Sequence, residues 1–287
     1  MFEFTRPIIE RAEDAAVNGA NACLAELRNL PLDDFGELVI SLPNPELPRI
    51  SAVLPAMASD EVQRHWTGNC GVDLLKQTNN FVRIVTQYYA LLMARPLGEA
   101  RILDFGCGYG RILRSMYYFA DPDNLYGCDP WDKSISLCKE AGILGHLAIS
   151  DYLPRTLPFE AKFDLIYAFS VFTHLSERAT STCLEALADR LTPDGLLVIT
   201  IRPVEYWAAR SDVSPDIVKE LADVHRNSGF AFLPHNRLPL DGDITYGDTS
   251  ISLDYIEKRF PQFKIEKIER TIDDRFQIIV FLRPVRA

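Results

Sequence analysis

Residues 101–114 read RILDFGCGYGRILR, the pattern of a strand, a glycine-rich turn and a helix. A run of strand length leads into three glycines, Gly106, Gly108 and Gly110, and a helical pattern follows. Glycines in such a turn let backbone N–H groups come within contact distance of a ligand, where a Cβ atom would collide. Asp129 lies 19 residues after Gly110, at the end of the next predicted strand, where a carboxylate can accept both hydroxyls of a ribose. The unit therefore predicts a nucleoside cofactor.

The spacing of the glycines indicates which nucleoside. A dinucleotide fingerprint has the pattern G-x-G-x-x-G, but here the third glycine comes one place early and Arg111 stands at the expected position. Asp104 lies two residues ahead of the first glycine. The stretch resembles the D/E-x-G-x-G-x-G motif of class I S-adenosylmethionine (SAM) dependent methyltransferases.

The resemblance extends over about two-thirds of the chain. Residues 163–166 (FDLI) look like the fourth-strand signature of that family, and residues 191–197 (LTPDGLL) are similar to its L-x-P-G-G turn before strand five. Asp194 replaces the usual first glycine of that turn, which bears only on the turn geometry. Together with residues 169–175 (FSVFTHL), the glycine-rich stretch looks like bacterial methyltransferases of sugar and secondary-metabolite pathways.

After Gly98, short apolar runs alternate with helical patterns, which is typical of a parallel sheet with crossover helices. The pattern predicts strands at 101–105, 124–128, 146–150, 163–169 and 196–201, with helices at 111–119, 133–140 and 177–190. After a helix at 253–260, runs at 263–268 and 276–282 are joined by so few residues that they must pair in antiparallel fashion. We expect an α/β fold: a Rossmann-like, seven-stranded, mostly parallel sheet with an antiparallel last strand and helices on both faces.

The residues before the sheet predict an N-terminal helical extension. Residues 6–27 follow the periodicity of one amphipathic helix, and five prolines in 31–55 are expected to break any regular element. Ser59 looks like the cap of a short helix towards Trp66, and a long helix is expected at 72–93. The domains expected are a helical extension or lid at 1–97, a SAM-binding core at 98–202, an insertion covering the acceptor site at 203–250, and the last helix and strand pair at 251–287.

Composition and charge narrow the class of partner. The 287 residues carry a formal net charge of −10, so the field of the whole molecule repels phosphate backbones and anionic lipids. No apolar stretch approaches the roughly 20 residues of a membrane span, and no signal peptide is evident. The six cysteines show no C-x-x-C pair, so we expect reduced thiols and no metal. We expect a cytoplasmic protein without nucleic-acid or membrane partners.

The resemblance implies roles for individual residues. Asp104 would hold the amino-acid end of SAM through its ammonium group, or would instead cap the next helix. Asp129 would bind the ribose, or would be an exposed strand-end acid. Pro130 and Trp131 would offer a flat surface to the adenine, unless Trp131 is a core residue. The expected cofactor-binding set is Asp104, Gly106, Cys107, Gly108, Gly110, Arg111, Asp129, Pro130, Trp131, Asp151, Tyr152 and Ser170.

Other members of this set have more specific roles. Asp151 would accept the adenine amino group with Tyr152 flanking the ring, and Arg111 would pair with the cofactor carboxylate or be a solvated first-turn arginine. Residues 66–68 (WTG) would fold over the cofactor as part of the N-terminal lid.

Methyl transfer from a sulfonium is a direct displacement, so the protein mainly aligns the reactants and removes a proton when the acceptor is a hydroxyl. His174 lies four residues past Ser170, near the carboxyl end of strand four, and is the candidate general base. Alternatively, its imidazole bonds a backbone carbonyl and shapes the loop. The remaining histidines, His65, His146, His225 and His235, are expected to be structural.

The function predicted is a SAM-dependent methyltransferase acting on a small polar acceptor, most plausibly O-methylation of a sugar or metabolite hydroxyl. A non-catalytic SAM-binding or interaction protein is an alternative. An NAD-type dehydrogenase is disfavoured by the displaced glycine and the antiparallel tail. No N/D-P-P-Y/F motif follows strand four, which disfavours nucleic-acid and protein amide substrates. The acceptor, its methylated atom and the oligomeric state stay open.

Overall fold

The computed structural model describes residues 3–285, and the chain divides into two compact units, Met1–Ile149 and Ser150–Ala287. Among the described residues, seven strands form one sheet in the order β3-β2-β1-β4-β5-β9-β8, and two more form a separate pair. This order and the direction of β9 confirm the predicted mostly parallel, Rossmann-like sheet. No helix within residues 3–285 combines the length and apolar character that crossing a membrane requires.

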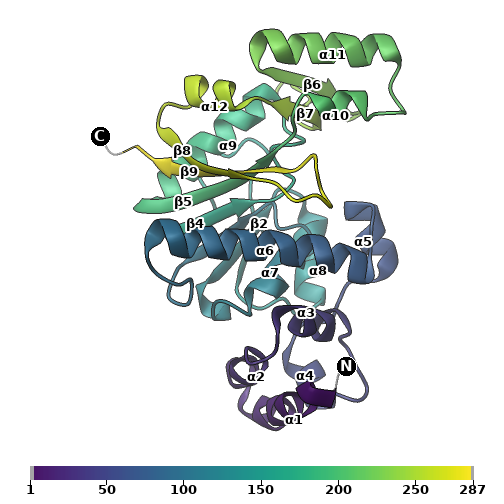
Figure 1. Cartoon of the computed structure of the whole chain (residues 1–287), viewed down its shortest axis with the longest axis vertical. Coiled ribbons are helices and arrows are strands. Elements are labelled where there is room, and N and C mark those ends of the chain that lie inside the picture. The colour runs from purple at the N-terminus through teal and green to yellow at the C-terminus, as the bar shows by residue number, and fades with distance from the viewer. Residues whose placement is uncertain (1–2, 286–287) are drawn as a thin grey trace. The chain divides into compact units, whose positions relative to one another are not determined.

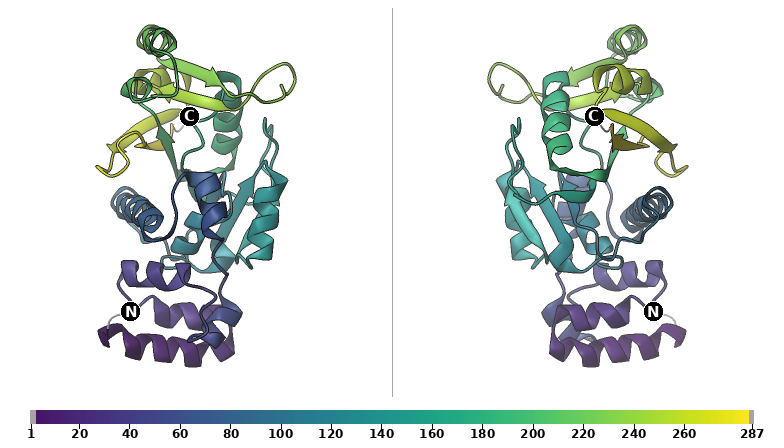
Figure 2. Two further views of the ribbon diagram at one scale, coloured as in Figure 1. Left: turned by 90° about the vertical axis from the view of Figure 1, so that its right-hand side faces the viewer. Right: turned by 90° about the vertical axis from the view of Figure 1, so that its left-hand side faces the viewer.

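The first unit runs from helices into parallel strands (Figure 1). Its helices are α1 (Arg6–Ala15), α2 (Ala20–Leu27), α3 (Leu32–Ile40), α4 (Pro48–Val53), α5 (Asp60–Thr67), α6 (Gly71–Met93), α7 (Arg111–Met116) and α8 (Asp132–Glu140). Its strands are β1 (Ile102–Phe105), β2 (Leu125–Asp129) and β3 (His146–Ile149), and β2 pairs in parallel with both others. Figure 2 shows α6 and α8 on opposite sides of these strands.

Two predictions for the N-terminal region are wrong. Residues 6–27 are not one helix, because Gly19 adopts a φ of 100° between α1 and α2, a backbone conformation that interrupts the helical path. The proline-rich residues 31–55 contain α3 and α4. Pro31 is the N-cap of α3 and Pro48 stands in the first turn of α4, positions where a missing N–H costs no hydrogen bond. The helix capped by Ser59 and the long helix α6 are confirmed.

The second unit holds the remaining elements of the sheet and a small subdomain. The elements are β4 (Phe163–Ala168), α9 (Glu177–Arg190), β5 (Leu191–Ile201), α10 (Glu205–Ala208), α11 (Pro215–Ser228), β6 (Phe230–Pro234), β7 (Gly247–Ile251), α12 (Leu253–Arg259), β8 (Phe263–Glu269) and β9 (Ile278–Pro284). β4 and β5 are parallel, whereas β9 is antiparallel to both β5 and β8, as predicted.

Strand five begins earlier than predicted. The segment 191–195, expected as a turn, already pairs with β4 through Leu191 and Phe163, and the register then shifts before Leu165. A Cβ atom at Gly195 would lie 2.9 Å from the carbonyl oxygen of Phe163. The glycine therefore lets the two backbones approach closely at the irregularity.

Residues 203–250 have a small core of their own. α11 packs on β6, and β6 pairs antiparallel with β7. Trp207, Leu221 and Ala231 are buried together, with Val204, Tyr206, Val218 and Leu233 packed around them. Trp207 donates its indole N–H to Ser250 Oγ at 2.7 Å, so the only polar atom of this large side chain has a partner. The segment is thus a folded subdomain rather than an extended loop.

Candidate functional site

The glycine-rich loop lies between β1 and α7 in the first unit. Gly106, Gly108 and Gly110 have φ values of 80°, 54° and 77°, in the left-handed region that glycine adopts without a steric penalty. The N–H groups of Gly106 and Cys107 both donate to the carbonyl oxygen of Cys128, at 2.8 and 3.1 Å. These bonds hold the start of the loop against the end of the neighbouring strand, β2.

Asp129 is bonded to this loop. Its Oδ2 accepts the Gly108 N–H at 3.0 Å, and its Oδ1 accepts the Trp131 N–H at 2.9 Å. Burial raises the pKa of the Asp129 carboxyl, although the N–H groups of Trp131 and Gly108 act in the opposite direction. A carboxylate has about four acceptor positions, so both oxygens can still accept hydroxyl groups. The residues fit a ribose at this point.

Two of the glycines have different neighbours. A Cβ atom at Gly110 would lie 2.9 Å from Ile143 side-chain atoms, so this glycine is required by packing. A Cβ atom at Gly108 would meet only Trp66, with its Cδ1 at 3.5 Å. The backbone of Gly108 is therefore the part of the loop open to a ligand.

Asp104 and Arg111 occupy the flanks of the loop. Asp104 is 2% exposed at the third position of β1, opposite Gly127. Arg111 begins α7 and donates Nη1 to Thr78 Oγ1 of α6 at 2.6 Å. Arg111 is partly buried in this position. Whether these two residues bind the cofactor stays a prediction.

The strand-end aromatic residue Trp131 is not a core residue, because 38% of it is exposed. Its ring stacks on that of Trp66, with ring centroids 5.0 Å apart and planes inclined by 17°. The Lys133 ammonium lies 5.6 Å from the centroid of each ring. Trp66 of α5 thus lies on one face of the Trp131 ring, and the adenine role of Trp131 stays a prediction.

Three predicted cofactor residues lie in the second unit. Asp151 is exposed and Tyr152 is 41% exposed, just beyond the end of β3. Ser170 follows β4 with a φ of 60°, and its N–H donates to Thr200 Oγ1 at 2.7 Å. Its hydroxyl accepts from Gln277 Nε2 at 3.1 Å. An L residue in this conformation is held by its neighbours, and strain of this kind is frequent at functional sites.

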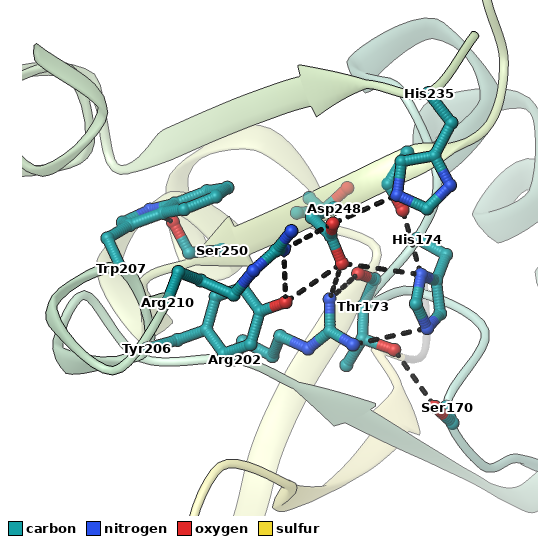
Figure 3. Close-up of polar contacts among 12 residues, drawn as sticks. Ser170, Thr173, His174, Arg202, Tyr206, Trp207, Arg210, His235, Asp248 and Ser250 are labelled. Atoms are coloured by element: carbon teal, nitrogen blue, oxygen red, sulfur yellow. Dashed lines mark hydrogen bonds and ion pairs between the residues drawn. The ribbon is translucent and has the colours of Figure 1, made fainter. Parts of the chain in front are cut away.

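A cluster of charged side chains surrounds Asp248 in the second unit (Figure 3). Asp248 Oδ1 accepts from Arg202 Nη1 at 2.7 Å and from the Tyr206 hydroxyl at 2.9 Å. Its Oδ2 accepts from Arg210 Nη1 at 2.5 Å and lies 2.9 Å from His235 Nε2. We call these five residues the Asp248 cluster. Burial alone would raise the pKa of Asp248, but bonds from His235 and Arg210, with the charge of Arg202, hold that pKa well below its ordinary value.

His174 lies at the edge of this cluster. Its Nδ1 is 2.8 Å from the carbonyl oxygen of Gly247, which can only accept, so Nδ1 carries the proton. Its Nε2 then holds the lone pair and faces Arg202 Nη2 at 3.2 Å. Burial, reinforced by the charge of Arg202, lowers the pKa of His174 to about 4. The bond from His174 to the Gly247 carbonyl is of the kind expected if His174 only shapes the loop. The role of His174 as general base stays a prediction.

The sequence reasoning did not identify the Asp248 cluster. Arg202 and Asp248 are 46 residues apart, and no motif spacing connects them. The one usable signal was a charged residue, Arg202, directly after the apolar run of β5. His235, expected to be structural, is one of the residues of this cluster.

Part of this chain is similar in sequence to a known protein family. Residues 102–195 match a family model described as a methyltransferase domain. This match covers β1, the glycine loop, the strand-end acid and β4. Residues 102–195 therefore form a methyltransferase domain, whose cofactor is SAM.

Several solved structures are similar to this chain. The magnesium protoporphyrin IX methyltransferase from Synechocystis PCC 6803 with bound S-adenosylhomocysteine (SAH) is similar, with a TM-score of 0.50, 16% identity, and coverage of 78% of this chain and 94% of that chain. A glycopeptide N-methyltransferase complexed with sinefungin has a TM-score of 0.48, 10% identity, and coverage of 70% and 92%. An S-adenosylmethionine-dependent methyltransferase from Clostridium acetobutylicum ATCC 824 has a TM-score of 0.43 and 14% identity, and the alignment covers 64% of this chain and 83% of that chain. A search of curated proteins gave no match.

Proposed function

We propose that this methyltransferase domain transfers the SAM methyl group to a hydroxyl of a small polar acceptor, such as a sugar or another metabolite. The observation that carries the cofactor half of the proposal is the bond from the Gly108 N–H to Asp129, because it joins the open loop to the strand-end acid. The net charge of −10 favours a small acceptor over a nucleic acid.

The cofactor would be held by the residues singled out from the sequence. Asp129 would accept the ribose hydroxyls, Gly108 would give the backbone access, and buried Asp104 would face the cationic amino-acid end. Trp131 would carry the adenine. The full proposed set is Asp104, Gly106, Cys107, Gly108, Gly110, Arg111, Asp129, Pro130, Trp131, Asp151, Tyr152 and Ser170.

The Asp248 cluster would belong to the acceptor side. His174 follows β4 and Arg202 follows β5, and ligands of open parallel sheets bind beyond the carboxyl ends of their strands. The subdomain 203–250 supplies the rest of the cluster and would cover the acceptor. The Tyr206 hydroxyl and the imidazoles of His174 and His235 come together there, and such polar groups suit a polar acceptor.

SAM supplies an activated methyl group when bound, so the protein has only to orient the hydroxyl and take its proton. Two imidazoles could do so. His174 offers Nε2, although this lone pair faces Arg202. His235 lies with Nε2 2.9 Å from Asp248 Oδ2 and its side chain is 41% exposed, an arrangement in which a carboxylate orients an imidazole.

The test is transfer from SAM with a labelled methyl group to a panel of sugar and metabolite hydroxyls, with amines as the comparison. We expect labelled ethers. The base is then identified with His174→Gln and His235→Gln, and exposed His146→Gln is the control. Loss of the base should lower kcat by roughly 10²–10⁴ without changing SAH affinity.

The outcomes separate the proposal from its alternatives. Labelled amines without labelled ethers would contradict O-methylation. SAH binding without transfer to any member of a broad panel would favour the non-catalytic SAM-binding protein. Binding of NADH in preference to SAH would favour the dehydrogenase.

A further inference from the structure

Trp66 and Trp131 lie against each other at the end of β2. Trp66 comes from α5 and Trp131 is the N-cap residue of α8. Their rings are nearly parallel, at 17°, with centroids 5.0 Å apart. Atoms of stacked rings are in contact at about 3.5–4.0 Å, so a further planar ring between them would require roughly twice that separation. An adenine cannot lie on this face of Trp131 while Trp66 does.

A second contact places Trp66 over the glycine loop. The only atoms within 4 Å of a Cβ built at Gly108 belong to Trp66, at 3.5 Å from Cδ1 and 3.8 Å from Nε1. Trp66 also meets Tyr109 edge-on, with centroids 6.3 Å apart. The indole therefore lies in the space bordered by Gly108 and Trp131. Asp129 accepts the N–H groups of both these residues.

The segment around Trp66 has the means to move its side chain. Gly68 is the C-cap residue of α5, with a φ of 78°, and α6 begins at Gly71, with a φ of 59°. No atom lies within 4 Å of the Cβ position of either glycine. The side chain of Trp66 is only partly buried, so the indole can leave Trp131 without unpacking a core.

We propose that Trp66 competes with the adenine of SAM for the same face of Trp131, so that the Trp66 side chain sets the affinity for the cofactor. The inference rests on the proposed placement of the cofactor at Asp129 and Trp131. In this arrangement the stacked pair is the closed state of the adenine subsite. SAM binds the state in which the indole has left, and the measured affinity is reduced by the fraction of molecules in that state.

The magnitude follows from the strength of the stack. Aromatic pairs contribute about 0.5–1.5 kcal/mol beyond the area they bury. Removing the indole should therefore tighten binding by about 2–10-fold, and the gain should lie in the association rate, because the fraction of open molecules limits association.

The experiment measures SAH binding by calorimetry and by stopped-flow kinetics in the full-length protein. Trp66→Ala should tighten binding and speed association, with the dissociation rate unchanged. Trp66→Phe, which keeps a smaller ring, should lie between it and the wild type. Arg64→Ala is the matched control on the exposed side of α5. Its guanidinium pairs with Asp60, and the variant should bind as the wild type does.

Two results would overturn the inference. If Trp66→Ala weakens SAH binding as Trp131→Ala does, Trp66 supports the adenine subsite instead of occupying it. If Trp66→Ala leaves affinity and association rate unchanged, the stack does not compete. Asp129→Ala separates these from failure of the proposed site: if it binds SAH as tightly as the wild type, the cofactor placement itself is wrong.

Discussion

The backbone N–H of Gly108 donates to Asp129 Oδ2 at 3.0 Å, and this bond joins the middle of the glycine loop to the end of the neighbouring strand. Asp129 thus has two tasks in the proposed site. It would hold the ribose, and it keeps the Gly108 backbone in a conformation that a ligand can approach.

Replacing Asp129 by Ala should weaken SAM binding by about 1.5–3 kcal/mol, which is roughly 10–150-fold in Kd, because hydrogen bonds to a charged group are lost. Calorimetry on the folded variant measures this. Asp123→Ala, an exposed carboxylate near the other end of β2, is the control and should bind normally. Unchanged affinity of Asp129→Ala would remove this residue from the site.

Gly108→Val should abolish SAM binding and leave the sheet formed. A β-branched residue is strained at a φ of 54°, and its methyl groups would fill the open side of the loop, where the ligand approaches. Gly98→Val is the matched control, because a Cβ there meets no atom within 4 Å and the residue has no positive φ. Circular dichroism and calorimetry test the pair. A native spectrum with wild-type affinity would contradict the prediction.

His174 should make stability depend on pH. Its pKa of about 4 in the folded protein lies below the ordinary 6.5, so the unfolded chain binds the proton first as pH falls. The stabilisation is complete above pH 6.5 and is lost between 6.5 and 4, about 2 kcal/mol of it between pH 7.5 and 5.

The measurement is urea unfolding of wild type and His174→Gln at pH 7.5 and 5. His225 also has a pKa lowered by burial, so the wild-type slope has more than one source and only the difference between the two proteins reports His174. Equal loss of unfolding free energy in both proteins would show that His174 titrates normally.

Asp248→Asn should lower the free energy of unfolding by about 3–5 kcal/mol, because it leaves the buried Arg202 guanidinium and the partly buried Arg210 guanidinium facing a neutral amide. SAH affinity should stay unchanged if the cluster serves the acceptor. Asp241→Asn is the control: it pairs with Arg178 at the surface and should change stability by less than about 1 kcal/mol. A stability loss no larger than that of the control would show that the Asp248 network is not a stabilising one.

Most strands of the sheet could be predicted from the sequence. The bounds of strands β1 to β4 were predicted to within a residue or two, because each is a short, largely apolar run bounded by turn residues. The glycine loop and Asp129 were also predicted, since their chemistry depends on particular residue types that lie a few positions apart or at the end of the next strand. The N-terminal helices were misjudged. Proline disfavours a helix interior but is accepted in its first turn, and a composition count does not separate the two.

By itself, the sequence determined the class of fold, the cofactor class and the residues at the ends of β1 and β2. These depend on local patterns, in which each residue acts through neighbours a few positions away. The contact of Trp66 with Trp131, and the meeting of Arg202, His235 and Asp248 in one cluster, came to light only from the folded chain. These contacts join side chains that are distant in the chain, so their partners are set by how helices and strands pack and not by any spacing in the sequence.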